Sequence, residues 1–237
     1  MMVLLERVLA GAMLVPFGVG LTSGTSADRD VVFRFADPEV VESSGLAVRD
    51  GLLLFATVND SGDTGRTFVV DGRTGETVGG AAWGEATDVE AVAPYDDGLL
   101  VGDIGDNSAE RDSVTLVQVP FERGQRTVDA PTFEVRYPGG ARDAESLLVH
   151  PVTGQVFIAS KDLFGGTLYA APAELSRDGR NLLEPVGPVL GIATDGAFFP
   201  DGNHLVLRDY GRAVVYEFPS LVEVGEVELP DQPQGEG

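Results

Sequence analysis

The chain has 237 residues, of which 43% are hydrophobic, and its 38 acidic residues against 16 basic ones give a formal charge of −22 at pH 7. This charge argues against nucleic acid and anionic membranes as partners, because both need a basic protein face, and it favours cations. The sequence has no cysteine, which excludes disulfides, lipid attachment at cysteine and cysteine catalysis.

The N-terminal segment has an apolar run from Val8 to Leu21, followed by small residues that end at Ala27. This pattern predicts a signal peptide over residues 1–27, one domain over residues 28–237, and a secreted or extracytoplasmic protein. The alternative is an uncleaved membrane anchor, although the run is shorter than the roughly 20 residues of a membrane span. The membrane is a partner only in that alternative.

After residue 30, helical periodicity is nearly absent, and short apolar or alternating runs follow one another. They include LLLFATV, GLLVGDI, SVTLVQV, QVFIAS, HLVLRDY and AVVYEF. The segments between them are typical hairpin turns, such as DGRTGE at 71–76 and PDGN at 200–203, in which aspartate caps the turn backbone. The pattern therefore predicts an all-β chain of consecutive antiparallel strands.

A short motif recurs at the start of each unit of this chain. Its copies are ESSGLAV (42–48), DVEAVAP (88–94), DAESLLV (143–149), ATDGAFF (193–199) and QGEG (234–237). A period of roughly 40 to 55 residues with about four strands predicts a β-propeller of four-stranded blades. Four blades and the start of a fifth are expected.

Closure of this ring is a separate question. We expect the run VVFRFA (31–36) to form a strand that completes the last blade. Because the fifth blade stops as it begins, either the chain is truncated at its C-terminus or the ring stays open.

The repeat predicts which side chains meet at one mouth of the central channel. The first strand of each blade descends the channel and the second returns, so the start of one lies beside the end of the other. The start motifs align Ser44, Glu90, Glu145, Asp195 and Glu236, and the end motifs NDSGD, GDIGDN, SKD and RDY supply Asp60, Asp103, Lys161 and Arg208.

Carboxylates dominate this predicted mouth. Carboxylates a few ångströms apart raise one another's pKa unless a cation lies between them, and hard oxygen ligands suit Ca²⁺. The candidate metal ligands are Asp60, Asp63, Asp88, Glu90, Asp103, Asp106, Asn107, Asp143, Glu145, Asp195 and Glu236. The alternative is that each aspartate followed by glycine only caps its own turn.

Lys161, the only lysine in the chain, and Arg208 would give the acidic mouth a cationic side. They could hold an anionic small molecule such as a phosphate or carboxylate, or they could pair with neighbouring carboxylates. Two functions follow. One is a binding or interaction module, which we place slightly ahead because a fold does not fix a function; the other is a calcium-dependent phosphoesterase or esterase with Lys161, Arg208, Glu90 and Glu145 as catalytic residues.

The ordered motifs ESSGLA, NDSG, DVEAVA, GDIGDN, DAESL, SKD, PDG, RDY and QGE resemble a family of secreted bacterial β-propeller proteins, mostly uncharacterised. The resemblance covers residues 42–236. More distantly, the chain is similar to phytase-like propellers, which implies calcium ions in an acidic channel that bind phosphate esters. The family usually has D-W-E-D in its second start motif, whereas this chain has Val89 and Ala91, and the family continues past Q-G-E, which implies truncation here.

Overall fold

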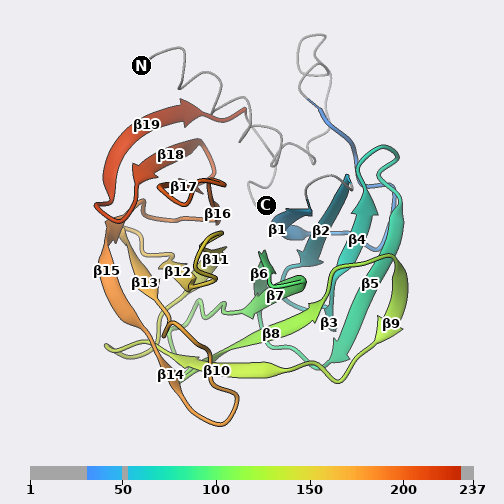
Figure 1. Cartoon of the computed structure of the whole chain (residues 1–237), viewed down its shortest axis with the longest axis horizontal. Coiled ribbons are helices and arrows are strands. Elements are labelled where there is room, and N and C mark those ends of the chain that lie inside the picture. Colours follow the sequence, from blue (N-terminus) through green and yellow to red (C-terminus); the bar gives the residue numbers. More distant parts are fainter. Residues whose placement is uncertain (1–30, 50–52, 231–237) are drawn as a thin grey trace.

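A computed structural model describes residues 31–49 and 53–230 of the chain. Every regular element among these residues is a β-strand, and the strands form four sheets around a central axis (Figure 1). The described residues are therefore arranged as a four-bladed β-propeller, which confirms the predicted all-β propeller fold class. In the described part of the chain, no helix is long and apolar enough to cross a membrane.

Each blade is an antiparallel meander whose first strand lies nearest the axis (Figure 1). Blade 1 contains β1 (Ser43–Arg49), β2 (Leu54–Asn59), β4 (Phe68–Asp71) and β5 (Thr77–Gly84), with the short β3 (Gly65–Arg66) beside β5. Blade 2 contains β6 (Val89–Tyr95), β7 (Gly98–Asp103), β8 (Val114–Pro120) and β10 (Thr132–Arg136). Blade 3 contains β11 (Ala144–Val149), β12 (Val156–Ser160), β13 (Gly166–Ala170) and β15 (Glu184–Val189). Blade 4 contains β16 (Asp195–Phe198), β17 (His204–Arg208), β18 (Arg212–Glu217) and β19 (Val222–Glu228).

Two accessory strands join neighbouring blades at the rim. Strand β9 (Gly124–Thr127) belongs by sequence to blade 2 but pairs in parallel with β5 of blade 1. Strand β14 (Asn181–Leu182) belongs to blade 3 but pairs in parallel with β10 of blade 2. Each therefore satisfies part of an outer strand edge that would otherwise stay open.

The hydrophobic core consists of layers between successive blades. Val58 and Val101 belong to the layer between blades 1 and 2, Leu116 and Leu147 to the next, and Phe157 to the layer between blades 3 and 4. Because blades are packed on both faces, strands such as β2 are buried at every position. This explains why the sequence shows apolar runs as well as alternation.

The face of blade 1 that points away from blade 2 is covered by the segment that precedes β1. Phe33 and Phe35 pack against a cluster of Phe55, Phe68 and Val70, and the rings of Phe33 and Phe55 lie 4.7 Å apart. The backbone N–H of Ala36 donates to the Gly75 carbonyl at 2.8 Å. The prediction of a strand at 31–36 is wrong, because these aromatic residues pack on the sheet face instead of extending a sheet edge.

Some predictions fall on segments outside the described residues. These are the signal peptide at 1–27 and the opening of a fifth blade at 234–237, with its candidate ligand Glu236.

Candidate cation site at the channel mouth

Equivalent backbone hydrogen bonds define one mouth of the channel in three blades. The N–H of Asp60 donates to the Glu42 carbonyl at 2.9 Å, and the N–H of Lys161 donates to the Asp143 carbonyl at 2.9 Å. In blade 2 the corresponding donor is the N–H of Gly105, 3.1 Å from the Asp88 carbonyl oxygen. The start motifs and the ends of the second strands therefore meet, as the repeat predicts.

The strand register corrects the predicted equivalence of Asp60, Asp103, Lys161 and Arg208. Asn59, Asp103, Ser160 and Arg208 are the residues that pair with Ser43, Val89, Ala144 and Asp195 at the starts of the inner strands. Asp60 and Lys161 lie one residue further along. In the first three inner strands the ladder then skips one residue, which is Gly45, Glu90 or Glu145.

Three of the predicted ligands converge at the junction of blades 1 and 2. One carboxylate oxygen from each of Asp60, Asp88 and Glu90 lies within 4.8 Å of the other two. Asp60 and Asp88 are half-buried, whereas Glu90 is only 2% exposed. Ser44 of blade 1 donates its hydroxyl to the Glu90 carbonyl oxygen at 2.7 Å, which ties the two blades together at this point.

Electrostatics at this cluster disfavour three bare carboxylates. Burial raises the pKa of Asp88, and the charges of Asp60 and Asp143 raise it further, while Arg111 partly opposes them. The Oδ1 atom of Asp88 is buried and has no hydrogen-bond partner among the described residues. Asp88 therefore carries a buried carboxylate oxygen to which no described residue donates a hydrogen bond, and its ionised form is disfavoured.

Gly105 makes room for this arrangement. A Cβ atom at this position would lie 2.3 Å from Asp88 Oδ2 and 2.9 Å from Glu90 Cγ. The second glycine of the GDIGDN motif is thus needed because the backbone at this position lies too close to two candidate ligands to leave room for a side chain.

We predict that Gly105→Ala displaces Asp88 and Glu90 and weakens cation binding at least tenfold, because the added methyl group occupies the space of the Asp88 carboxylate. Gly139→Ala is the matched control, since a Cβ there meets only the end of the Arg142 side chain, at 3.5 Å. Calcium titration by calorimetry distinguishes the two variants. Equal affinity in both would show that the position of Gly105 does not matter to the site.

Other predicted ligands already bind protein groups. Asp103 accepts the N–H groups of Thr87 and Asp88 at 2.8 and 3.0 Å and forms an ion pair with Arg111 at 2.8 Å. Asp106 accepts the N–H groups of Glu110 and Arg111, both at 2.9 Å. These two aspartates fix the loop that carries Gly105, and Asn107 is exposed on the same loop.

Asp143 lies between the cluster and blade 3. Its Oδ1 accepts the N–H of Asp106 at 2.8 Å, and its charge acts on Asp88. Glu145, by contrast, forms an ion pair with Lys161. Burial alone would lower the pKa of Lys161, but the hydrogen bond from Lys161 to Glu145, the charge of Glu145 and the contact with Tyr210 raise it. Lys161 therefore pairs with a neighbouring carboxylate, which was the alternative to its binding an anionic small molecule. The catalytic roles of Lys161 and Glu145 stay predictions.

Blade 4 contributes Asp195 and Arg208, which pair across β16 and β17. Burial raises the pKa of Asp195 to about 6, although hydrogen bonds from the N–H groups of Gly196 and Leu46 and the charge of Arg208 act in the opposite direction. Because Leu46 belongs to β1, Asp195 links blade 4 to blade 1 across the axis. This contact favours a structural role for Asp195, and its role as a metal ligand stays a prediction.

The raised pKa of Asp195 predicts a pH-dependent stability. Its value of about 6 exceeds the ordinary 3.8, so the folded state binds a proton more tightly and this contribution to stability falls as pH rises from about 4 to 6. The loss is about 3 kcal/mol. The side chain of Asp195→Asn cannot ionise. The melting temperature of this variant should therefore rise relative to that of the wild type as the pH increases from 4.5 to 8. Parallel melting profiles of the two proteins would contradict this.

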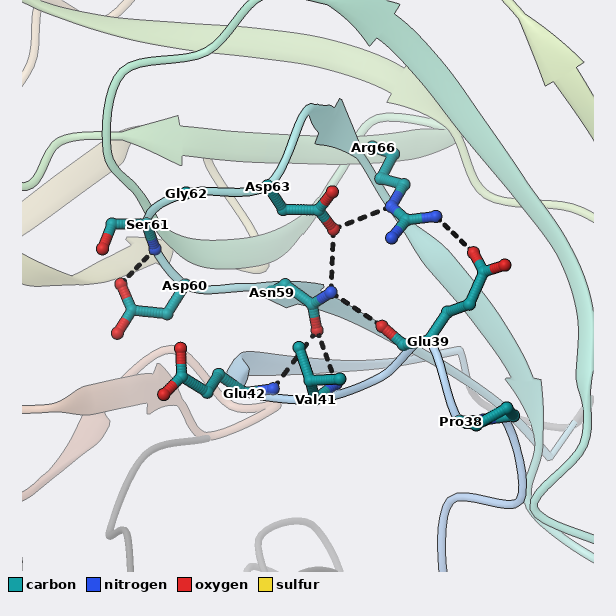
Figure 2. A pocket seen from close by; sticks show the side chains of 10 residues that line it. All are labelled: Pro38, Glu39, Val41, Glu42, Asn59, Asp60, Ser61, Gly62, Asp63 and Arg66. Atoms are coloured by element: carbon teal, nitrogen blue, oxygen red, sulfur yellow. Dashed lines mark hydrogen bonds and ion pairs between the residues drawn. The ribbon is translucent and has the colours of Figure 1, made fainter.

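A pocket of about 440 Å³ adjoins the cluster and shares Asp60 with it (Figure 2). Asn59 organises its wall, because its Nδ2 donates to the Glu39 carbonyl and to Asp63, both at 2.8 Å, and its Oδ1 accepts the N–H of Val41 at 3.1 Å. Arg66 binds Asp63 at 2.7 Å and also Glu39. Burial alone would raise the pKa of Asp63, but Arg66, Asn59 and the N–H of Thr64 lower it.

The sequence prediction missed Asn59, Glu39 and Arg66 in this pocket. Asn59 could have been found, since it begins the NDSGD motif. Glu39 and Arg66 lie outside the repeated motifs, and only the folded chain brings them to Asp63. Their ion pairs hold Asp63 as a wall residue, so the three oxygens of Asp60, Asp88 and Glu90 form the better candidate site.

No family model and no curated protein matches the chain, so the resemblance to secreted bacterial propellers stays a prediction. Among solved structures, the chain is similar to a functionally unknown protein from Desulfotomaculum acetoxidans, with 13% identity, a TM-score of 0.49, and coverage of 82% of this chain and 60% of that one. It is also similar to Kuenenia stuttgartiensis hydrazine synthase, with 12% identity, a TM-score of 0.47, and coverage of 83% and 57%.

A third similar structure is an auxiliary nutrient binding protein from Bacteroides thetaiotaomicron, with 12% identity, a TM-score of 0.44, and coverage of 83% of this chain and 43% of that one. The chain thus spans 43% to 60% of the length of these three proteins.

Proposed function

We propose that this propeller is a binding module whose channel mouth holds a divalent cation, calcium, between Asp60, Asp88 and Glu90. The observation that carries the proposal is the approach of three carboxylate oxygens within 4.8 Å of one another. Two oxygens bound to one calcium ion at 2.3 to 2.6 Å cannot lie more than about 5 Å apart, so this spacing fits a shared ion.

The surroundings of the three side chains support the same proposal. The structure shows no ion pair between Asp60 or Asp88 and any basic side chain that it describes, whereas Asp63, Asp103 and Glu145 each have one. A cation would compensate the buried Oδ1 of Asp88 and the repulsion that raises the pKa of this residue. Calcium suits the site better than magnesium, because ligands from two blades and a loop match its flexible coordination.

The test is a pair of melting curves for the full chain, one with calcium and one with chelator. We expect calcium to raise the melting temperature, since a ligand that binds only the folded state stabilises it. Magnesium at the same concentration should have a smaller effect. Identical curves in calcium and in chelator would contradict the proposal.

A further inference from the structure

The pocket beside the cation cluster has the size of a small-molecule site. Its volume of about 440 Å³ lies within the range of roughly 300 to 1,000 Å³ that is usual for such sites. Its walls come from the segment before β1, the end of β2, the loop after β2, and Arg66 of β3. Because Asp60 belongs to both the pocket and the cluster, an ion bound to its carboxylate would lie at the edge of the pocket.

One wall of the pocket is fixed by hydrogen bonds within the protein. Asn59 is buried, and its Nδ2 donates to the Glu39 carbonyl and to Asp63, both at 2.8 Å. Its Oδ1 accepts the N–H of Val41 at 3.1 Å. Arg66 is shared by two carboxylates, since its Nε binds Asp63 at 2.7 Å and its Nη1 binds Glu39. The only basic side chain of the lining is therefore already engaged by two acids, which argues against an anionic ligand.

The other end of the pocket presents groups that the protein leaves available. Figure 2 shows the carboxylates of Asp60 and Glu42 there, beside Ser61, whereas Arg66 lies at the far end. Among the residues that the structure describes, none bonds to the Glu42 carboxylate or to the Ser61 hydroxyl. The Glu42 side chain is exposed and can only accept hydrogen bonds when it is ionised. A ligand that fits this end must therefore donate hydrogen bonds without carrying negative charge.

Hydroxyl groups meet this requirement better than an ammonium group. An ammonium group beside Asp60 would face the charge of the calcium ion that we propose at the same carboxylate, whereas a neutral hydroxyl can bind calcium through its oxygen and donate its proton to Glu42. Calcium takes about six to eight oxygen ligands, so three carboxylates that give one oxygen each leave about three or more positions open. Val41, which is 70% exposed, and Pro38 add apolar surface on which the C–H groups of a ring can pack.

We propose that this pocket binds a neutral saccharide unit through two adjacent hydroxyl groups. The two hydroxyl oxygens complete the coordination of the ion at Asp60, and one of the hydroxyls donates to Glu42. This inference rests on the proposed calcium site and adds the class of ligand that the site would take.

The test compares the full-length wild type with Glu42→Ala, first in calcium and then in chelator. The probes are mannose, galactose and xylose, which present adjacent hydroxyls in both cis and trans arrangements. Cyclohexanol, with one hydroxyl, and cyclohexylamine, with one ammonium group, are the control ligands. Glu174→Ala is the matched control variant, because Glu174 is an exposed glutamate of blade 3 with no ion pair to any described residue. Titrations followed by ligand-observed NMR give the affinities, and calorimetry measures calcium binding separately.

We expect at least one of the three sugars to bind the wild type in calcium and to lose at least tenfold in affinity in chelator. Glu42→Ala should weaken sugar binding about tenfold, because a hydrogen bond to a charged acceptor is lost. This loss should exceed any change in the calcium affinity of the variant, and Glu174→Ala should bind sugar like the wild type.

The outcomes separate this inference from the proposed function. If calorimetry shows calcium binding but none of the sugars binds, the saccharide inference is overturned and the calcium site stands. Sugar binding that is unchanged in chelator or in Glu42→Ala would also overturn it, as would equal or tighter binding of cyclohexanol or cyclohexylamine. An absence of calcium binding in calorimetry would contradict the proposed function and this inference with it.

Discussion

Asp88→Asn should abolish the stabilisation of this protein by calcium. At a calcium concentration 100 times the dissociation constant, binding stabilises the wild type by about 2.7 kcal/mol. For a chain of this size, that corresponds to an increase of about 5 to 10 °C in melting temperature. The variant removes a charged ligand and should show an increase close to zero.

In chelator the same variant should be at least as stable as the wild type. Burial and the charges of Asp60 and Asp143 raise the pKa of Asp88, so a neutral side chain at this position avoids a desolvation cost and a repulsion that the metal-free protein tolerates. Asp97→Asn is the matched control, because it changes the net charge equally at an exposed turn between β6 and β7. Scanning calorimetry in calcium and in chelator gives both comparisons. A calcium response in Asp88→Asn equal to that in Asp97→Asn would contradict the assignment of Asp88.

Gly75→Ala should destabilise the fold by about 3 to 5 kcal/mol, because it removes the cover of blade 1. A Cβ at this position would lie 1.7 Å from the Arg34 carbonyl oxygen, and Gly75 has a φ of +75°. The conformational strain costs about 1 to 2 kcal/mol, and displacing Phe33 and Phe35 from the sheet face costs the rest. Urea unfolding measures the loss.

Gly154→Ala is the control that measures the backbone strain without a steric clash. Gly154 has a φ of +71°, but a Cβ there would have no atom within 4 Å, so only the strain of about 1 to 2 kcal/mol should appear. Trypsin should also cleave after Arg34 faster in Gly75→Ala than in Gly154→Ala. Equal losses of stability in the two variants would show that residues 33–36 contribute little to the fold.

The propeller fold could be predicted because the sequence patterns that specify it are local and recur at a regular interval. Hairpin turns such as PDGN place strand ends, and the start motifs around Glu90 and Glu145 repeat at a blade-like interval. The accessory strands β9 and β14 could not be predicted, since each pairs with a different blade from the one that contains it in sequence. The segment at 31–36 has strand-like alternation, and only the open face of blade 1 decides that Phe33 and Phe35 pack there instead.

The sequence predicted which residues lie near the candidate site better than it predicted how they are arranged. The motifs correctly bring Asp60, Asp88 and Glu90 to one mouth, but the sequence does not distinguish them from Asp103 and Asp106. That distinction depends on hydrogen bonds and ion pairs with residues such as Arg111, which follows Asp106 in a loop of no regular pattern. The pairing of Lys161 with Glu145 likewise depends on the extra residue that shifts the β11 ladder.

The most direct test of the calcium site is a crystal structure of the protein grown in calcium, with anomalous scattering recorded at a long wavelength. We expect an anomalous peak 2.3 to 2.6 Å from oxygens of Asp60, Asp88 and Glu90, at the junction of blades 1 and 2. Ordered calcium elsewhere on the mouth, with no peak between these three side chains, would contradict the account.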